Sequence, residues 1–245
     1  MGKLIWIDIL TPKQGNFFNV LSKRLTKQGH TPILTTRLYR EVNQLLEAKG
    51  LKAYIIGKHG GARIEEKLLA SAERVSKLAR FIGRRNPDLA LSFSSPEAAR
   101  VAFGLGIPHL CISDSPHAEA VSRLTIPLSE RLFTPAVIPK KEWLGYGISA
   151  GRIVQYDALD PIVWLRNFRP DRRILIRDGI KSRRKIVTVR LEESSAAYLL
   201  AKKRRKLLNT VGAIREMLRN MLEADIVALP RYSYQAEILR REFKH

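Results

Sequence analysis

The stretch Leu4-Ile5-Trp6-Ile7-Asp8-Ile9-Leu10, followed by Thr11-Pro12-Lys13-Gln14-Gly15, decides the fold class. The first part is apolar except for Asp8, which is typical of a buried strand, and the proline and glycine after it mark a turn. An apolar stripe with helical spacing comes next, made of Phe17, Phe18, Leu21 and Leu25. A largely apolar strand that leads into an amphipathic helix indicates a parallel sheet with helices on both faces.

The same alternation continues along the chain. Short apolar runs predict five further strands, at residues 32–35, 53–57, 89–92, 109–113 and 131–134. Helical spacing predicts helices at residues 17–28, 38–49, 64–85, 96–105 and 116–130. Gly29, Gly50 and Gly106 lie where three of these helices should end. The pattern therefore predicts an α/β fold built on a parallel sheet.

A second, smaller region begins after Trp164. Residues 166–184 are rich in arginine, and the following chain predicts a strand, a helix, a strand and a helix, at residues 185–190, 202–223, 226–230 and 235–243. We therefore expect one domain over residues 1–165 and a partial second domain over residues 166–245. Two parallel strands bury little apolar surface, so the second domain should pack on the first or on another subunit, which leaves a homo-oligomer open.

The composition describes a basic chain with enough apolar residues for a core. Of 245 residues, 45% are hydrophobic, which excludes wholesale disorder, and the net charge is +21. A single cysteine excludes a disulfide framework and a cysteine-based zinc site, and five histidines without close pairs do not suggest a metal site. No apolar run approaches the roughly 18 residues that cross a bilayer. We expect a cytoplasmic protein without a membrane span.

Polar residues follow several predicted strands, at the edge where parallel α/β sheets bind ligands. They are Lys13, Lys58, Gly60, Gly61, Ser94, Ser95, Asp114 and His117. The Gly60-Gly61 pair permits close approach of a phosphate, or forms a strand-to-helix turn. The stretch Ser94-Ser95-Pro96-Glu97 is explained by helix capping, although its hydroxyl and N–H groups also suit an anion. The chain has no Walker lysine pattern and no dinucleotide-binding glycine motif, so those classes have little support.

Asp114 and His117 form the densest polar cluster. We expect Ser115 or Asp114 to cap a helix that Pro116 begins, which places His117 in its first turn. A carboxylate near an imidazole suits general acid–base chemistry. The alternative is structural: the pair caps the helix, and His117 leans on the core beside Val121 and Leu124. Glu119 and Arg123 are four residues apart and could form a surface ion pair.

Residues 202–206 are a run of five cations at the start of a predicted helix. The run is a solvated face, or it meets an anion such as nucleic acid, phosphate or anionic lipid. Nearby basic residues keep a nucleic-acid partner open: Arg177, Lys181, Arg183, Arg184 and Lys185. Neither an RNP motif nor a helix-turn-helix accompanies them.

Several motifs together resemble an uncharacterised, mostly archaeal domain family. They include Ile5-Trp6-Ile7-Asp8, Gly57-Lys58-His59-Gly60-Gly61, residues 95–108, Asp114, His117-Ala118, Arg123-Leu124, Pro127-Leu128, Thr134-Pro135, Val189-Arg190, Ala197-Tyr198 and Pro230-Arg231-Tyr232. That family is similar to the UDP-N-acetylglucosamine 2-epimerases and, more distantly, to GT-B glycosyltransferases. The resemblance implies two Rossmann-like domains that face a cleft, with a second domain that is short in this chain. It implies a nucleotide-activated sugar as ligand, a UDP-sugar above all, and no metal or other cofactor.

The resemblance also assigns site residues. The epimerases carry an aspartate after the fourth strand, where this chain has Ser94-Ser95, and a His-x-Glu after the fifth, where it has Ser113-Asp114-Ser115. We expect Asp114 and His117 to be catalytic. The expected binding residues are Lys13, Lys58, Gly60, Gly61, Ser94, Ser95, Arg123, Arg190 and Arg231. The alternatives are a basic protein that binds nucleic acid or another polyanion, and a non-catalytic remnant of such an enzyme.

Overall fold

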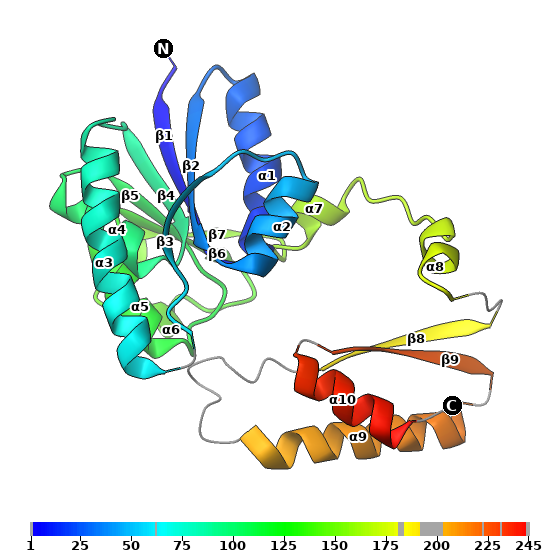
Figure 1. Ribbon diagram of the computed structural model, residues 1–245. Helices are drawn as coiled ribbons and strands as arrows, with labels where there is room; N and C mark the ends of the chain where they lie inside the picture. The colour runs from blue at the N-terminus through cyan, green and yellow to red at the C-terminus, as the bar shows by residue number, and fades with distance from the viewer. Residues whose placement is uncertain are drawn as a thin grey trace. The chain divides into compact units, whose positions relative to one another are not determined.

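The computed structural model describes residues 2–61, 63–180, 184–191, 203–221, 223–230 and 232–243. The chain divides into two compact units, Met1–Phe168 and Arg169–His245 (Figure 1). Within the described residues, we find no helix with the length and apolar character needed to cross a membrane.

The first unit is built on a parallel sheet of seven strands in the order β3-β2-β1-β4-β5-β6-β7. The strands are β1 (Leu4–Ile9), β2 (Thr31–Leu38), β3 (Tyr54–Lys58), β4 (Leu89–Phe93), β5 (His109–Ile112), β6 (Arg131–Pro135) and β7 (Ile153–Tyr156). The sequence predicted the first six. It did not predict β7, because only two apolar residues precede Gln155 and the run is too short to identify a strand.

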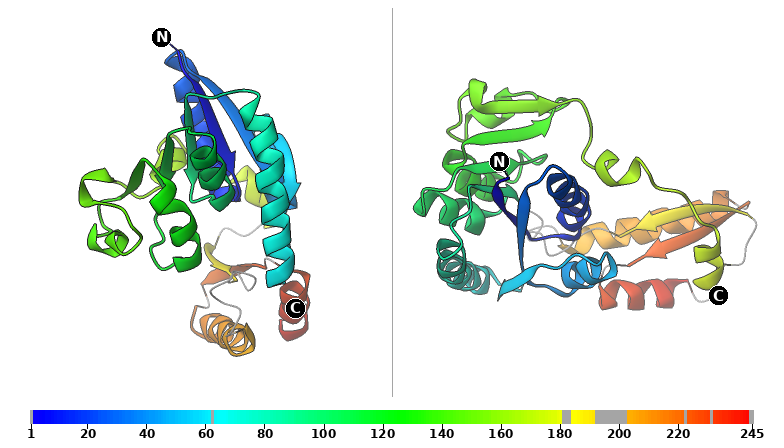
Figure 2. Two further views of the ribbon diagram at one scale, coloured as in Figure 1. Left: turned by 90° about the vertical axis from the view of Figure 1, so that its left-hand side faces the viewer. Right: turned by 90° about the horizontal axis from the view of Figure 1, so that it is seen from above.

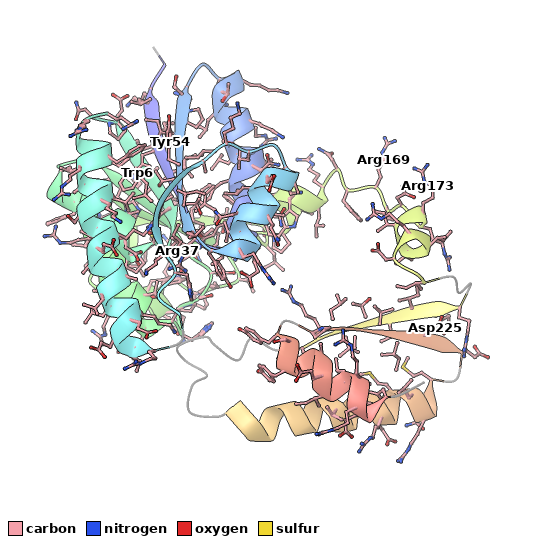
Figure 3. The ribbon with its side chains drawn as sticks, viewed as in Figure 1. Trp6, Arg37, Tyr54, Arg169, Arg173 and Asp225 are labelled. Carbon is pink, nitrogen blue, oxygen red and sulfur yellow. The ribbon has the colours of Figure 1, made fainter. Side chains whose placement is uncertain are left out.

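Helices cover both faces of this sheet (Figure 2). They are α1 (Pro12–Lys27), α2 (Arg40–Ala48), α3 (Ile64–Gly83), α4 (Pro96–Gly104), α5 (Glu119–Thr125), α6 (Lys141–Leu144) and α7 (Ile162–Leu165). The alternation of β1 explains the two layers. Ile5 and Ile7 pack with α1 and α2, whereas Trp6 points to the other face and packs with α3 and α4 (Figure 3).

The start of α1 places a lysine at the ligand edge of the sheet. We predicted this helix from Phe17, but it begins at Pro12, because Thr11 caps it by accepting a hydrogen bond from Gln14 N at 3.4 Å. The prediction missed this turn because it carries polar residues instead of an apolar stripe. Lys13 therefore belongs to the first turn of the helix.

The second unit has a parallel sheet of two strands, β8 (Lys185–Arg190) and β9 (Ala224–Leu229), as the sequence predicted. Its helices are α8 (Arg173–Arg177), α9 (Lys203–Asn220) and α10 (Ser233–Glu242). Leu191, Ile214 and Leu239 form a small buried core. The segment before β8 is basic, and Arg169 and Arg173 project outward from it (Figure 3).

Candidate functional site

Three charged side chains meet at the carboxyl edge of the first sheet. Lys13 lies in the first turn of α1, Asp114 follows β5, and Asp160 follows β7. The Lys13 ammonium donates to Asp160 Oδ2 at 2.7 Å and forms a second ion pair with Asp114. The partners are 147 and 101 positions from Lys13 in sequence, and they meet because these loops share the edge where parallel strands end.

Two aromatic residues complete the surroundings of Lys13. Its Nζ lies 4.2 Å from the centroid of the Phe93 ring, which is a cation–π distance. Tyr156, the last residue of β7, donates its hydroxyl hydrogen to Asp160 Oδ1. The Asp160 side chain is only 1% exposed, and both of its oxygens accept a hydrogen bond. This carboxylate is therefore compensated inside the protein.

The charges of the cluster follow from these contacts. Burial raises the pKa of Asp114, but the hydrogen bond and charge of Lys13 outweigh it and hold the pKa below its usual value. Burial and the neighbouring Asp160 carboxylate raise the pKa of Tyr156, so its phenol is neutral at pH 7. Asp114 is therefore ionised at neutral pH, which suits a proton or hydrogen-bond acceptor better than a donor.

A pocket of about 210 Å³ opens beside the cluster. Lys13, Phe93 and Asp114 line it together with four serines, Ser94, Ser113, Ser115 and Ser122. Ser94 has a φ of 51°, a left-handed conformation that is uncommon for a residue other than glycine. Its hydroxyl donates to Ile112 O at 3.1 Å. A carboxylate surrounded by hydroxyl groups can hydrogen-bond a ligand that carries hydroxyls of its own.

A buried ion-pair network lies at the end of β1, and the sequence analysis did not identify it. Arg74 donates to Asp8 Oδ2 at 3.0 Å and to Asp8 Oδ1 at 2.6 Å, and both side chains are fully buried. Asp8 also accepts from Thr35 at 2.6 Å and Ser95 at 2.7 Å. Burial raises the pKa of Asp8, but these partners outweigh burial and the pKa lies below its usual value. The network joins β1, β2, α3 and the start of α4.

Ser95 belongs to this network and is buried. Its side chain accepts from Ala98 N at 3.2 Å as the N-cap of α4, and donates to Asp8. The capping interpretation of this motif is therefore confirmed. Ser94 lines the pocket, so the two neighbouring serines have different surroundings.

Lys58, Gly60 and Gly61 line a different pocket of about 500 Å³, at the end of β3. Gly61 has a φ of +70°, and its N–H donates to His59 Nδ1 at 3.1 Å. A Cβ on Gly60 would come within 2.5 Å of Lys67 Cα, so the glycine permits the loop to pack on α3. Two carboxylates, Glu66 and Glu73, also line this pocket. The glycine pair thus serves as a strand-to-helix turn.

The predicted start of the helix after β5 is wrong. α5 begins at Glu119 after the N-cap Ala118, so Asp114 and Ser115 are not caps and Pro116 does not begin it. The reason is that Asp114 binds Lys13, and the Ser115 hydroxyl donates to Asp114 at 2.9 Å. His117 therefore lies in a turn that precedes the helix, where it is exposed.

The remaining predicted residues lie elsewhere. Arg123 forms the expected surface ion pair with Glu119 at 2.8 Å, on α5. Arg190 is the exposed last residue of β8 in the second unit. Arg231 and Lys202 fall outside the described residues, and residues 203–206 contribute the backbone of the first turn of α9. Of the predicted site residues, Lys13, Ser94 and Asp114 therefore meet in one pocket, and Asp160 and Tyr156 were missed.

Metal binding would need several ligating side chains close together in the part of the chain that the structure describes. No group of three or more histidine, cysteine, aspartate or glutamate residues there could hold a metal ion. The acidic residues of the site, Asp114 and Asp160, use Lys13 as their shared cation.

Comparison with known proteins places the chain among uncharacterised relatives. One family, described as "Protein of unknown function (DUF354)", matches residues 3–244. An uncharacterised protein of Methanocaldococcus jannaschii, MJ0665, is 30% identical over 242 residues, which cover 96% of this chain and 68% of that protein.

Solved structures with a similar fold include sugar-nucleotide enzymes. UDP-GlcNAc 2-epimerase from Neisseria meningitidis bound to UDP-GlcNAc has a TM-score of 0.76 at 16% identity, covering 98% of this chain and 70% of that one. The MnaA–UDP co-structure of S. aureus has a TM-score of 0.75 at 15% identity, covering 98% of this chain and 66% of that one. MurG of Acinetobacter baumannii has a TM-score of 0.50 at 14% identity, covering 97% of this chain and 70% of that one. The fold is therefore that of the epimerases and GT-B glycosyltransferases, and the chain spans about two thirds of their length.

Proposed function

Since the chain belongs to the DUF354 family, whose reaction is unknown, we propose that it handles a nucleotide-activated sugar, by transfer or by epimerisation. The observation that carries the proposal is the Asp114 carboxylate. It lines a pocket with four serines at the carboxyl edge of the sheet, and Lys13 keeps it ionised. Structures of the same fold bound to UDP or UDP-GlcNAc give additional support to this ligand class.

Both reactions need a base near the sugar. Transfer removes a proton from an acceptor hydroxyl, and epimerisation removes one from a carbon, so each requires an ionised group positioned against the ligand. We assign this role to Asp114. His117 is the proposed second acid–base group, because the exposed turn that carries it begins only two residues after Asp114.

The proposed binding residues divide by location. Lys13 and Ser94 line the pocket with Asp114, whereas the neighbouring Ser95 is buried and donates to Asp8. Lys58 offers a cation at the end of β3, and Gly60 and Gly61 line the same pocket. Arg123 of the first unit, and Arg190 and Arg231 of the second, are further proposed nucleotide-binding residues, and Arg190 is a candidate partner for an anion.

Isothermal calorimetry with UDP-GlcNAc, UDP and UMP tests this proposal. We expect heat of binding with the sugar nucleotide, and turnover that falls at least a hundredfold in Asp114→Asn, the usual size of a lost general base. Asp157→Asn is the matched control, because Asp157 is an exposed carboxylate in the loop that follows β7. A folded sample that binds none of these nucleotides at millimolar concentration would contradict the proposal and favour a non-catalytic remnant.

A further inference from the structure

Asp160 is the most constrained carboxylate of the site. It follows β7, is almost completely buried, and accepts from two side chains that lie on different elements. Lys13 on α1 donates to one of its oxygens and Tyr156 on β7 donates to the other. A buried carboxylate with two such donors fixes the positions of both donors, because leaving either oxygen unpaired is costly.

The charges around Lys13 do not cancel. One ammonium lies between the carboxylates of Asp114 and Asp160, and the Tyr156 phenol is neutral. Counted by formal charge, the ammonium and the two carboxylates sum to one negative charge, although the whole chain is strongly basic. Two of the three N–H donors of Lys13 are used by carboxylates, and its ammonium also lies over the Phe93 ring. Little positive charge remains to attract an anion into the pocket.

The hydroxyl groups that line the pocket carry no charge and both donate and accept hydrogen bonds. They come from Ser94, Ser113, Ser115 and Ser122. A sugar ring presents the complementary hydroxyls, whereas a phosphate would lie against the Asp114 carboxylate, whose charge Lys13 does not neutralise alone because it also pairs with the buried Asp160. The pocket therefore suits the neutral sugar of a sugar nucleotide and does not suit its charged diphosphate.

We propose that Asp160, held in place by Tyr156, is a positioning residue that fixes Lys13 against Asp114 and makes the serine pocket accept a neutral polyhydroxyl group and exclude a phosphate. This inference rests on the proposed function for the identity of the polyhydroxyl group, the sugar of the nucleotide. Asp160 itself acts through Lys13 and Asp114. The exclusion of phosphate follows from the negative charge that Asp160 adds.

The test measures how fast acetic anhydride acetylates Lys13 in the full chain. Mass spectrometry after digestion gives the rate, and the exposed Lys27 is the internal reference. Asp160→Asn should raise the rate at Lys13 on the order of tenfold relative to Lys27, the ratio that corresponds to losing one charge-assisted hydrogen bond. Tyr156→Phe should raise it severalfold, because Asp160 then loses one partner but keeps its charge. Asp157→Asn should leave it unchanged.

Inorganic phosphate provides the second arm of the same experiment. Phosphate at roughly 10–50 mM is concentrated enough to reveal weak binding. It should slow the acetylation of Lys13 in Asp160→Asn but leave the wild-type rate unaltered. Unchanged Lys13 reactivity in both Asp160→Asn and Tyr156→Phe would overturn the proposal, as would equal protection by phosphate in the wild type. If Asp160→Asn does not fold, Tyr156→Phe alone decides the positioning role, and phosphate added to the wild type decides the exclusion.

Neither readout involves a nucleotide, so the two proposals can fail separately. Protection of wild-type Lys13 by UDP-GlcNAc is the arm that depends on the proposed function. If UDP-GlcNAc does not protect Lys13 but the Lys13 rates of the variants change as expected, the nucleotide sugar is contradicted as the ligand and the positioning role of Asp160 stands.

Discussion

Replacing Arg74 with leucine should strongly destabilise the first unit. The substitution removes two hydrogen bonds to Asp8, at 3.0 and 2.6 Å, and leaves a fully buried carboxylate with only the Thr35 and Ser95 hydroxyls. Breaking a buried ion pair from one side costs about 3–5 kcal/mol. The substitution also removes the hydrogen bond from Arg74 Nε to Ile56 O, which is 2.9 Å long.

Urea denaturation followed by tryptophan fluorescence measures this cost. All three tryptophans, Trp6, Trp143 and Trp164, belong to the first unit, so the signal reports that unit alone. The double replacement Asp8→Leu with Arg74→Leu removes both charges and should be less destabilised than the sum of the two single replacements, since replacing both members of a buried ion pair by apolar residues is often neutral. A cost below about 1 kcal/mol for Arg74→Leu, or strict additivity in the double variant, would refute the reasoning.

Three further predictions concern stability and charge. Folding lowers the pKa of Asp8, so the ionised carboxylate stabilises the fold fully above its unfolded pKa of about 3.9. This stabilisation is lost as the pH falls through the lower folded pKa, so the urea midpoint should decrease between pH 7 and pH 3. A midpoint that rises on acidification contradicts this. Ser95→Ala should cost about 2–3 kcal/mol, through one cap and one buried bond to a charged group. Ser115→Ala loses only the part-buried bond to Asp114 and should cost about 1 kcal/mol; equal losses in urea melts would contradict the different surroundings of the two serines. Replacing the four arginines of residues 169–177 with glutamine should lower the salt dependence of RNA binding if that segment is a polyanion site, and an unchanged slope in filter binding would assign the attraction to the charge of the whole chain.

The fold could be predicted from the sequence because its central strands are apolar on both faces. Six strands of the first unit appear as short apolar runs, and the glycines that end helices separate them. β7 could not be predicted in this way, because its sequence Ile153-Val154-Gln155-Tyr156 is short and half polar. Missing this strand also removed the basis for placing Asp160 at the ligand edge.

The site was predicted where each residue directly follows an apolar run, as Asp114 does. Pairings across the chain were not predicted, because the partner of Lys13 lies 147 positions away and the partner of Arg74 lies 66 positions away. A signal for Arg74 does exist in the sequence. It occupies the buried stripe of α3 with Ala70, Leu78 and Ile82, and a charged residue at such a position indicates a buried counter-charge. The start of the helix after β5 was predicted wrongly because helix caps are read from neighbouring residues. The ion pair of Asp114 with Lys13 joins residues 101 positions apart, which the local sequence does not show.

Calorimetric titration of UDP-GlcNAc into the wild type, Asp114→Asn and Asp157→Asn tests the central claim most directly. We expect equal affinity for the wild type and Asp157→Asn, and affinity weaker by about tenfold for Asp114→Asn, which loses one charge-assisted hydrogen bond to a ligand hydroxyl. Thermal melts of the same samples should confirm that all three are folded. Equal affinity in all three proteins, or no heat in any of them at millimolar ligand, would contradict a sugar-nucleotide site at Asp114.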